Sequence, residues 1–218
     1  GVLIVSLAPA DDLVERFHVT QCPVVLIDAE YGGLSSVTVE HEASATLAVR
    51  HLLELGHRRI ALIDRPEDPF TATYSGGRHA GYRQVLAAAG LPVRPEYEAL
   101  TKFTPEAGIA ALYTMLELPQ PPTAIFVGSD SQAIGVIQGA RQRGCRVPED
   151  LSVVGYNDVE VSQYLGLTTV RVPMCKMGRR GVELLLARLD EPEQAPVQER
   201  LQATLVVRTT TGPPAVEE

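Results

Sequence analysis

The chain has 218 residues, of which 45% are hydrophobic and 21% are charged, and its formal net charge is −8. It contains no run of about 18 uncharged apolar residues, which argues against a membrane-spanning helix and a membrane partner. The negative charge argues against a protein that binds DNA by itself, because phosphate contacts need a basic face.

Apolar runs of strand length alternate with helical patterns along almost the whole chain. We expect strands at residues 2–7, 23–28, 36–40, 60–64, 97–103, 124–127, 152–156, 167–172 and 201–208. We expect helices at residues 11–18, 42–55, 77–89, 105–118, 131–143 and 174–189, with a polar connection at 191–198. Gly56, Gly90 and Gly144 follow three of these helices and are expected to end them. The alternation predicts an α/β fold with mostly parallel sheets and helices on both faces.

Signatures of enzymes and metal sites are absent from the sequence. There is no GxGxxG, no GxxxxGK[ST] and no GxSxG, so we expect no bound cofactor and no catalytic residues. Cys22, Cys145 and Cys175 lie far apart and form no CxxC or Cys/His pair. We therefore expect reduced thiols, no metal and a cytoplasmic protein.

Polar residues stand just past the ends of three expected strands: Asp28, Ser129, Asp130, Asn157 and Asp158. Because ligands of parallel sheets bind beyond the carboxyl ends of the strands, this pattern predicts a binding site. For any one of these residues, the alternative is that it caps the helix that follows. This alternative is strong for Asp130 and Asp158.

Two further residues are candidates for the same site. Arg78 stands at the start of a helical pattern, where its charge opposes the helix dipole, so it needs an acidic partner or an anionic or hydroxylated ligand. Phe103 stands between a strand and a helix that has Thr104 as its expected N-cap and Pro105 at its first position. Its ring belongs either to the core or to a surface that stacks on a ligand ring.

Several stretches of the chain also resemble one known family. They are HLLELGHRRIALID (51–64), SGGRHAGYRQVLAAAGL (75–91), PPTAIFVGSDSQAIGVIQGARQRGCRVPEDLSVVGYND (121–158), and then LTTVRVP, MGRRGVELLL and LVVRTTT. In order and spacing they are similar to the effector-binding domain of the LacI/GalR (lactose-repressor) family of transcription regulators.

The resemblance implies two parallel-sheet subdomains of the type I periplasmic-binding-protein kind. Residues 1–57 and 171–192 would form an incomplete N-terminal subdomain, and residues 58–170 and 193–218 the C-terminal one. Residues 1–7 resemble the third strand of the family, so the sequence is expected to be N-terminally truncated. The effector would bind in the cleft between the subdomains.

The resemblance also assigns roles to the candidate residues. Arg78 matches the family's effector-binding arginine, Phe103 its stacking aromatic residue, and Asp28 its cleft acid. Ser129 takes the place of a residue that is often Asn or Asp, next to Asp130. Asn157 stands where an effector-contacting aspartate is common, so one negative charge is missing, which leaves room for a less hydroxyl-rich or more anionic effector.

The resemblance implies a cytoplasmic, homodimeric repressor that senses a sugar, a sugar derivative or a nucleobase. Operator DNA would be bound only through a helix-turn-helix head that the sequence does not contain. A solute-binding protein of the periplasmic type is the alternative. An enzyme that uses Asp28 and Asp158 is a third hypothesis, although no motif supports it.

Overall fold

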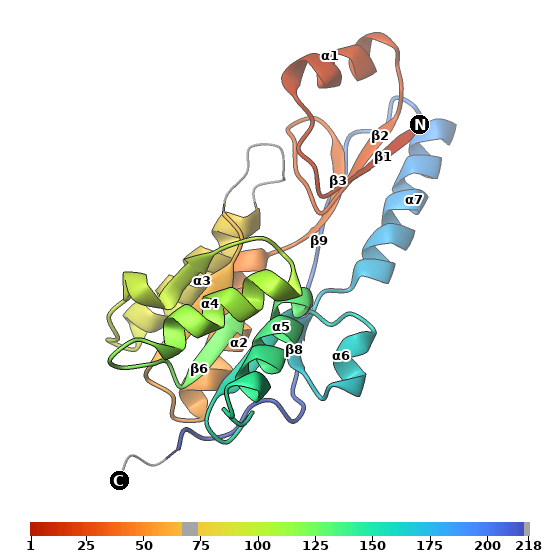
Figure 1. Ribbon diagram of the computed structural model, residues 1–218. Helices are drawn as coiled ribbons and strands as arrows, with labels where there is room; N and C mark the ends of the chain where they lie inside the picture. Colours follow the sequence, from red (N-terminus) through yellow and green to blue (C-terminus); the bar gives the residue numbers. More distant parts are fainter. Residues whose placement is uncertain (67–73, 216–218) are drawn as a thin grey trace. The chain divides into compact units, whose positions relative to one another are not determined.

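The computed structural model describes residues 1–66 and 74–215, which form two compact units (Figure 1). The first unit contains Gly1–Glu40 and Pro173–Ala203. The second unit contains His41–Pro66 and Ser75–Val172, and continues from Thr204. The predicted α/β class with parallel sheets is confirmed by the pairing of the strands within each unit.

The first unit is a four-stranded sheet with a helix on each face. Its elements are β1 (Val2–Val5), α1 (Asp11–Val19), β2 (Val24–Ile27), β3 (Ser35–Val39), α7 (Met174–Asp190) and β9 (Gln198–Leu201). The strand order is β1-β2-β3-β9 and every pairing is parallel. Alternate residues of β2 face opposite ways: Leu26 packs with Val14 of α1, and Ile27 approaches Gly181 of α7.

The second unit is built around a six-stranded sheet. Its strands are β4 (Ile60–Asp64), β5 (Glu98–Leu100), β6 (Ala124–Val127), β7 (Ser152–Asn157), β8 (Thr168–Arg171) and β10 (Thr204–Val206). Its helices are α2 (His41–Glu54), α3 (Tyr74–Ala88), η1 (Pro95–Tyr97), α4 (Pro105–Leu116), α5 (Asp130–Gln142) and α6 (Val161–Tyr164). The order is β10-β8-β7-β6-β4-β5, and only the β10–β8 pairing is antiparallel among the described strands.

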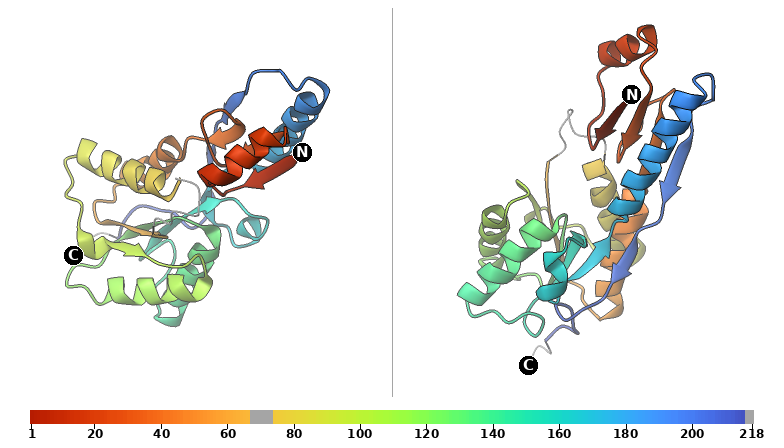
Figure 2. Two further views of the ribbon diagram at one scale, coloured as in Figure 1. Left: turned by 90° about the horizontal axis from the view of Figure 1, so that it is seen from above. Right: turned by 90° about the vertical axis from the view of Figure 1, so that its right-hand side faces the viewer.

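The two faces of this sheet carry different helices. One face packs against α4 and α5, where Ile63, Ile125 and Val153 join Leu112 and Val136 in one apolar cluster. The helices α2 and α3 lie on the other face, as the left view of Figure 2 shows. The period of two along each strand therefore decides which helix a strand-end side chain meets.

The end of the chain differs from the prediction. The single strand expected at 201–208 is wrong, because β9 pairs with β3 in the first unit and β10 pairs with β8 in the second. The sequence QERL of β9 has no apolar alternation, so its start lay hidden in the expected polar connection. The short helix α6 was not predicted either, because four residues carry no helical period.

The compact units also divide the chain at other points than the predicted subdomains. Helix α2 belongs to the second unit, because its buried face packs on β8 and β10. Residues 193–203 belong to the first unit, because β9 extends the first sheet. Residues 67–73 and 216–218, which the prediction places in the C-terminal subdomain, lie outside the described residues.

The Thr104 cap and the glycine stops that the sequence predicts at helix ends are confirmed. Thr104 caps α4 by accepting a hydrogen bond from the Ala107 N–H at 3.3 Å. Gly56 and Gly144 follow α2 and α5 with φ of 102° and 71°, a conformation that glycine adopts without steric cost. None of the helices in the described ranges is both long and apolar enough to cross a membrane.

Candidate functional site

The carboxyl ends of β4, β6 and β7 in the second unit carry a cluster of polar and aromatic side chains. These strands are parallel neighbours, so their carboxyl ends lie at one edge of the sheet. Asp64 ends β4, Ser129 and Asp130 follow β6, and Asn157 ends β7. The structure thus gathers these residues at one edge of a parallel sheet, the place where such sheets bind ligands.

A buried ion pair joins Asp64 to Arg78. Arg78 of α3 donates from Nε at 3.0 Å and from Nη2 at 2.9 Å to the two carboxylate oxygens of Asp64. The side chains are 7% and 0% exposed. Asp64 shares the parity of Ile60 and Leu62, which turns it toward the face that α3 covers. The acidic partner that Arg78 needs is therefore Asp64, which sequence reasoning missed although a carboxylate ends the otherwise apolar strand IALID.

Two neighbouring residues accommodate the Asp64 carboxylate, one by a hydrogen bond and one by lacking a side chain. The backbone N–H of Arg65 donates to Oδ1 at 2.8 Å. A Cβ on Gly128, just after β6, would collide with the same carboxylate. The glycine in the sequence VGSD is thus the signal that a buried group lies beside it.

Two aromatic rings lie against the Arg78 guanidinium. Its central carbon is 5.6 Å from the centre of the Phe103 ring and 5.2 Å from the centre of the Tyr156 ring, distances typical of cation–π contacts. The Tyr156 hydroxyl and Nδ1 of His41, at the start of α2, are 2.8 Å apart and joined by a hydrogen bond. The structure therefore brings Arg78 and Phe103 into contact and places Tyr156 and His41 beside them.

Asn157 and Asp158 follow one another at the end of β7 but differ in their partners. Asn157 is half-buried with φ of 110°, and its side chain makes no hydrogen bond to any residue in the described ranges. Asp158 accepts hydrogen bonds from Nε of Arg171 at 2.6 Å and from Nη2 of Arg208 at 2.8 Å. Burial raises the pKa of Asp158, but the hydrogen bonds from Arg208 and Arg171 outweigh it and leave this pKa below its ordinary value. Capping by Asp158 is not observed, because α6 begins only at Val161.

Two residues after β6, Ser129 and Asp130, differ from the capping prediction. Ser129, not Asp130, is the N-cap of α5, since its Oγ accepts a hydrogen bond from the Gln132 N–H at 3.2 Å. Asp130 is 1% exposed and accepts hydrogen bonds from the Val159 N–H, Ser162 Oγ and Thr169 Oγ1.

The surroundings of Asp130 fit a structural role. Burial raises its pKa above the ordinary value, while those three hydrogen bonds act in the opposite direction. A Cβ on Gly155 would collide with this carboxylate, so β7 leaves room for it. Asp130 therefore joins α5 to the segment after β7. Its effect on a bound ligand would come chiefly from holding these neighbouring segments in place.

Asp28 belongs to the first unit, where it follows β2 with φ of 55°. Its Oδ2 accepts a hydrogen bond from the Ser6 hydroxyl at 3.2 Å. This places a carboxylate at the carboxyl end of the first unit's parallel sheet.

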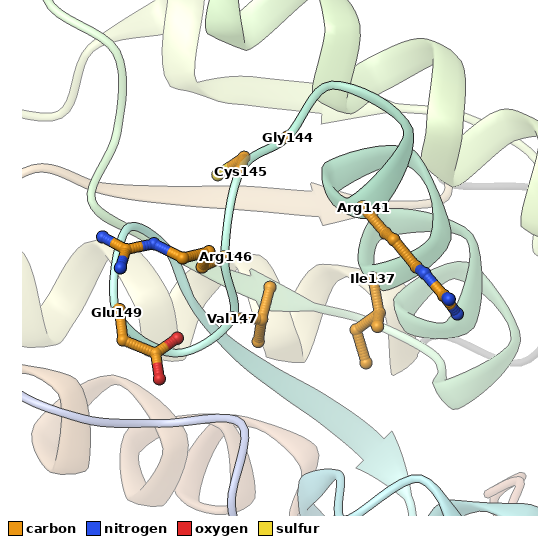
Figure 3. Close-up of a pocket in the computed structure, with 7 residues that line it drawn as sticks. All are labelled: Ile137, Arg141, Gly144, Cys145, Arg146, Val147 and Glu149. Atoms are coloured by element: carbon orange, nitrogen blue, oxygen red, sulfur yellow. The ribbon is translucent and has the colours of Figure 1, made fainter.

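A cavity of about 400 Å³ lies at the other end of α5, between that helix and the loop 144–149 (Figure 3). Arg146, which lines it, is bound to Asp150 by hydrogen bonds of 2.8 and 2.7 Å. The cavity is far along the helix from the strand-end cluster and has none of its buried polar groups. We therefore assign the candidate site to the strand ends. No group of three or more His, Cys, Asp or Glu side chains within residues 1–66 and 74–215 is placed to hold a metal ion.

Comparison with known proteins gives the class first. Residues 49–211 match the family model described as a periplasmic binding protein-like domain. The parallel sheets of the two units agree with this class.

Individual relatives then narrow the class to a family. The HTH-type transcriptional repressor CytR of Escherichia coli (strain K12) is 37% identical over 180 residues, which are 82% of this chain and 52% of that protein. A LacI family transcriptional regulator from Mycobacterium smegmatis is 33% identical with a TM-score of 0.82, covering 98% of this chain and 79% of that chain. The transcriptional regulator CelR in its complex with cellobiose is 32% identical with a TM-score of 0.86, covering 96% of this chain and 65% of that chain. The chain therefore belongs to the LacI/GalR family of transcriptional regulators, and it spans about half the length of the curated relative.

Proposed function

We propose that this chain is the effector-sensing domain of a transcriptional repressor. The observation that carries the proposal is the position of Arg78 at the strand ends. Its guanidinium is held by two hydrogen bonds to Asp64 and lies against the rings of Phe103 and Tyr156. A fixed guanidinium beside aromatic rings binds a ring with polar substituents at little entropic cost, because its side chains are ordered before the ligand arrives. The repressor named among the relatives and the cellobiose complex of another support this reading.

The proposed effector is a sugar, a sugar derivative or a nucleobase. Phe103 stacks on its apolar face, and Nη1 of Arg78, which Asp64 leaves unoccupied, donates to a ring oxygen or carbonyl. The Asn157 amide offers both a donor and an acceptor to a hydroxyl or a base edge. Ser129 and Asp130 position the end of β6, and Asp28 is proposed as a contact from the first unit.

Operator DNA is, in this proposal, bound by a helix-turn-helix head outside residues 1–218. The chain itself carries a net charge of −8, which does not suit contacts with phosphates. Effector binding would alter the DNA affinity of that head, provided that the effector binds two states of the protein unequally. We further propose a cytoplasmic homodimer, which sedimentation analysis of the purified protein would test.

Thermal unfolding with added ligands tests the site. Ribose, cellobiose and adenine are added singly, and a ligand at 100 times its Kd should add about 2.7 kcal/mol to the free energy of unfolding. Phe103→Leu should abolish the shift, because the stacking face is lost. Tyr113→Leu is the matched control, since Tyr113 lies on α4 with its hydroxyl bonded to Gln142. A binding ligand whose shift survives Phe103→Leu would refute the site.

An enzymatic role for Asp28 and Asp158 has less support. Asp158 is held by two arginines and its pKa is lowered, so it is a poor general acid. The function we propose requires only binding.

A further inference from the structure

The charge of Arg78 is already neutralised in this site. Two of its nitrogens donate to the two oxygens of Asp64, and both side chains are buried. The Asp158 carboxylate, in turn, is shared by Arg171 and Arg208. Neither Arg78 nor Asp158 therefore presents an uncompensated charge to a ligand.

Arg65, the residue after Asp64, differs from Arg78 in this respect. Its guanidinium carbon is 5.4 Å from the centre of the Phe103 ring, against 5.6 Å for that of Arg78. The Arg65 side chain forms no ion pair in the described part of the chain, and its buried Nε has no hydrogen-bond partner. A buried N–H without a partner is unfavourable, and a group that accepts from the guanidinium would relieve it.

The carboxylate of Asp130, after β6, is 1% exposed and already accepts hydrogen bonds from Val159, Ser162 and Thr169. Asn157 ends β7 with a neutral amide that makes no hydrogen bond in the described ranges. The Phe103 ring thus lies beside Arg78, which Asp64 neutralises, and beside Arg65, which has no ion-pair partner within residues 1–66 and 74–215. Among these residues, positive charge is in excess next to the stacking surface.

We propose that the effector of this chain carries an anionic group, a phosphate or a carboxylate, which Arg65 binds while the effector ring stacks on Phe103. The inference rests on the proposed function and names its ligand class. The planar guanidinium matches both groups, because each offers two oxygens to its parallel N–H donors.

Calorimetric titration of the whole chain with matched probes tests this. The pairs are ribose with ribose 5-phosphate and glucose with glucuronate, and inorganic phosphate is titrated alone. We expect the charged member of at least one pair to bind about 10-fold or more tightly than its neutral partner, because hydrogen bonds between ions are the stronger ones. That preference should weaken at high salt. Binding of inorganic phosphate as tight as that of the sugar phosphate would overturn the stacking part of the proposal.

Variants assign the preference to Arg65. Arg65→Gln should remove the preference for the charged probe and leave the affinity for the neutral sugar within about 2-fold, while Arg65→Lys should keep part of it. Arg50→Gln removes the same charge from the exposed face of α2 and should change nothing. Melting of each variant without ligand checks that it folds.

The outcomes separate the two proposals. Neutral sugars that bind as tightly as the charged ones, or a preference that survives Arg65→Gln, overturn the inference and leave the proposed function standing. No binding of any probe by a folded chain overturns both.

Discussion

Gly128 stands beside the Asp64 carboxylate so closely that a methyl group on its Cα would collide with Oδ1 and Cγ of that side chain. Gly128 limits the space on one side of the Asp64 carboxylate, and the ion pair with Arg78 holds it on the other. Asp64 cannot move away from Gly128 without breaking its bonds to Arg78. The position of the end of β6 and the geometry of the ion pair therefore depend on each other.

Gly128→Ala should destabilise the chain, because either the ion pair or strand β6 must shift to admit the methyl group. We expect a loss of about 1–3 kcal/mol in the free energy of unfolding, measured by urea denaturation. Gly178→Ala is the control of opposite sign, since nothing lies within 4 Å of a Cβ at that position of α7. It should stabilise its helix by about 0.5–1 kcal/mol. Equal effects of the two substitutions would contradict the packing described.

Asp64→Ala should be among the most damaging single changes. It leaves the Arg78 guanidinium, with 7% of its side chain exposed, buried without a counter-charge. The expected cost is about 3–5 kcal/mol. The double variant Asp64→Leu with Arg78→Met should recover most of that loss, because it removes both charges, yet it should not bind effector. A loss below about 1 kcal/mol for Asp64→Ala would show that the pair is open to water.

Asp158→Asn should weaken the junction between β7, β8 and the segment after β10. The carboxylate is 6% exposed and bonded to two arginines, so we expect a loss of about 1.5–3 kcal/mol at neutral pH. Arg208→Gln should cost more than Arg171→Gln, since their side chains are 17% and 54% exposed and water screens the second. The reverse order in urea denaturation would argue against this assignment.

The contribution of Asp158 also depends on pH. Its pKa is lowered in the folded chain, so its stabilisation is present above the unfolded pKa of about 3.9 and is lost as pH falls through the folded value. In Asp158→Asn, unfolding measured down that acidic range should lack this part of the pH dependence.

His57 gives a second pH dependence, near neutrality. Its ring is 1% exposed and is bonded to Thr123, Ser152 and the Gly212 carbonyl. Burial lowers the pKa of His57, although the bond to Gly212 opposes this. The unfolded chain therefore binds the proton more readily, so stability is full above the unfolded pKa of about 6.5 and falls as pH drops below it.

The substitution His57→Gln should reduce that decline between pH 7.5 and 5.5, whose slope for one proton is at most about 1.4 kcal/mol per pH unit. Burial also lowers the pKa of His51, which should supply the part of the decline that remains. His18→Gln, on the exposed side of α1, should leave the slope as it is in the unsubstituted chain. A decline that is as steep in His57→Gln as in the unsubstituted chain would contradict the role given to His57.

The sequence by itself determined the features that depend on near neighbours. Gly56, Gly90 and Gly144 marked helix ends, because only glycine takes φ above zero without cost. Thr104 and Pro105 marked the start of α4 for a similarly local reason. The alternation of strands and helices was enough for an α/β fold with parallel sheets, since parallel strands need crossovers.

The tertiary structure decided which of the strand-end residues act together. The sequence indicated Arg78 and Phe103 as candidates from their places next to helices and strands. It did not indicate that Asp64 neutralises Arg78, because that ion pair forms between a strand and a helix. Tyr156 and His41 joined the site for the same reason, at a sequence separation of 115 residues. Asp130 changed from a cap to a buried link, since its partners come from the segments after β7 and from β8.

The division of the last strand had the same cause. Nothing in residues 198–206 indicates that β9 and β10 belong to different sheets, because the choice of partner lies in β3 and β8. Local preferences fix the conformation of a segment, whereas its neighbours across the fold fix where it pairs and what charge it faces.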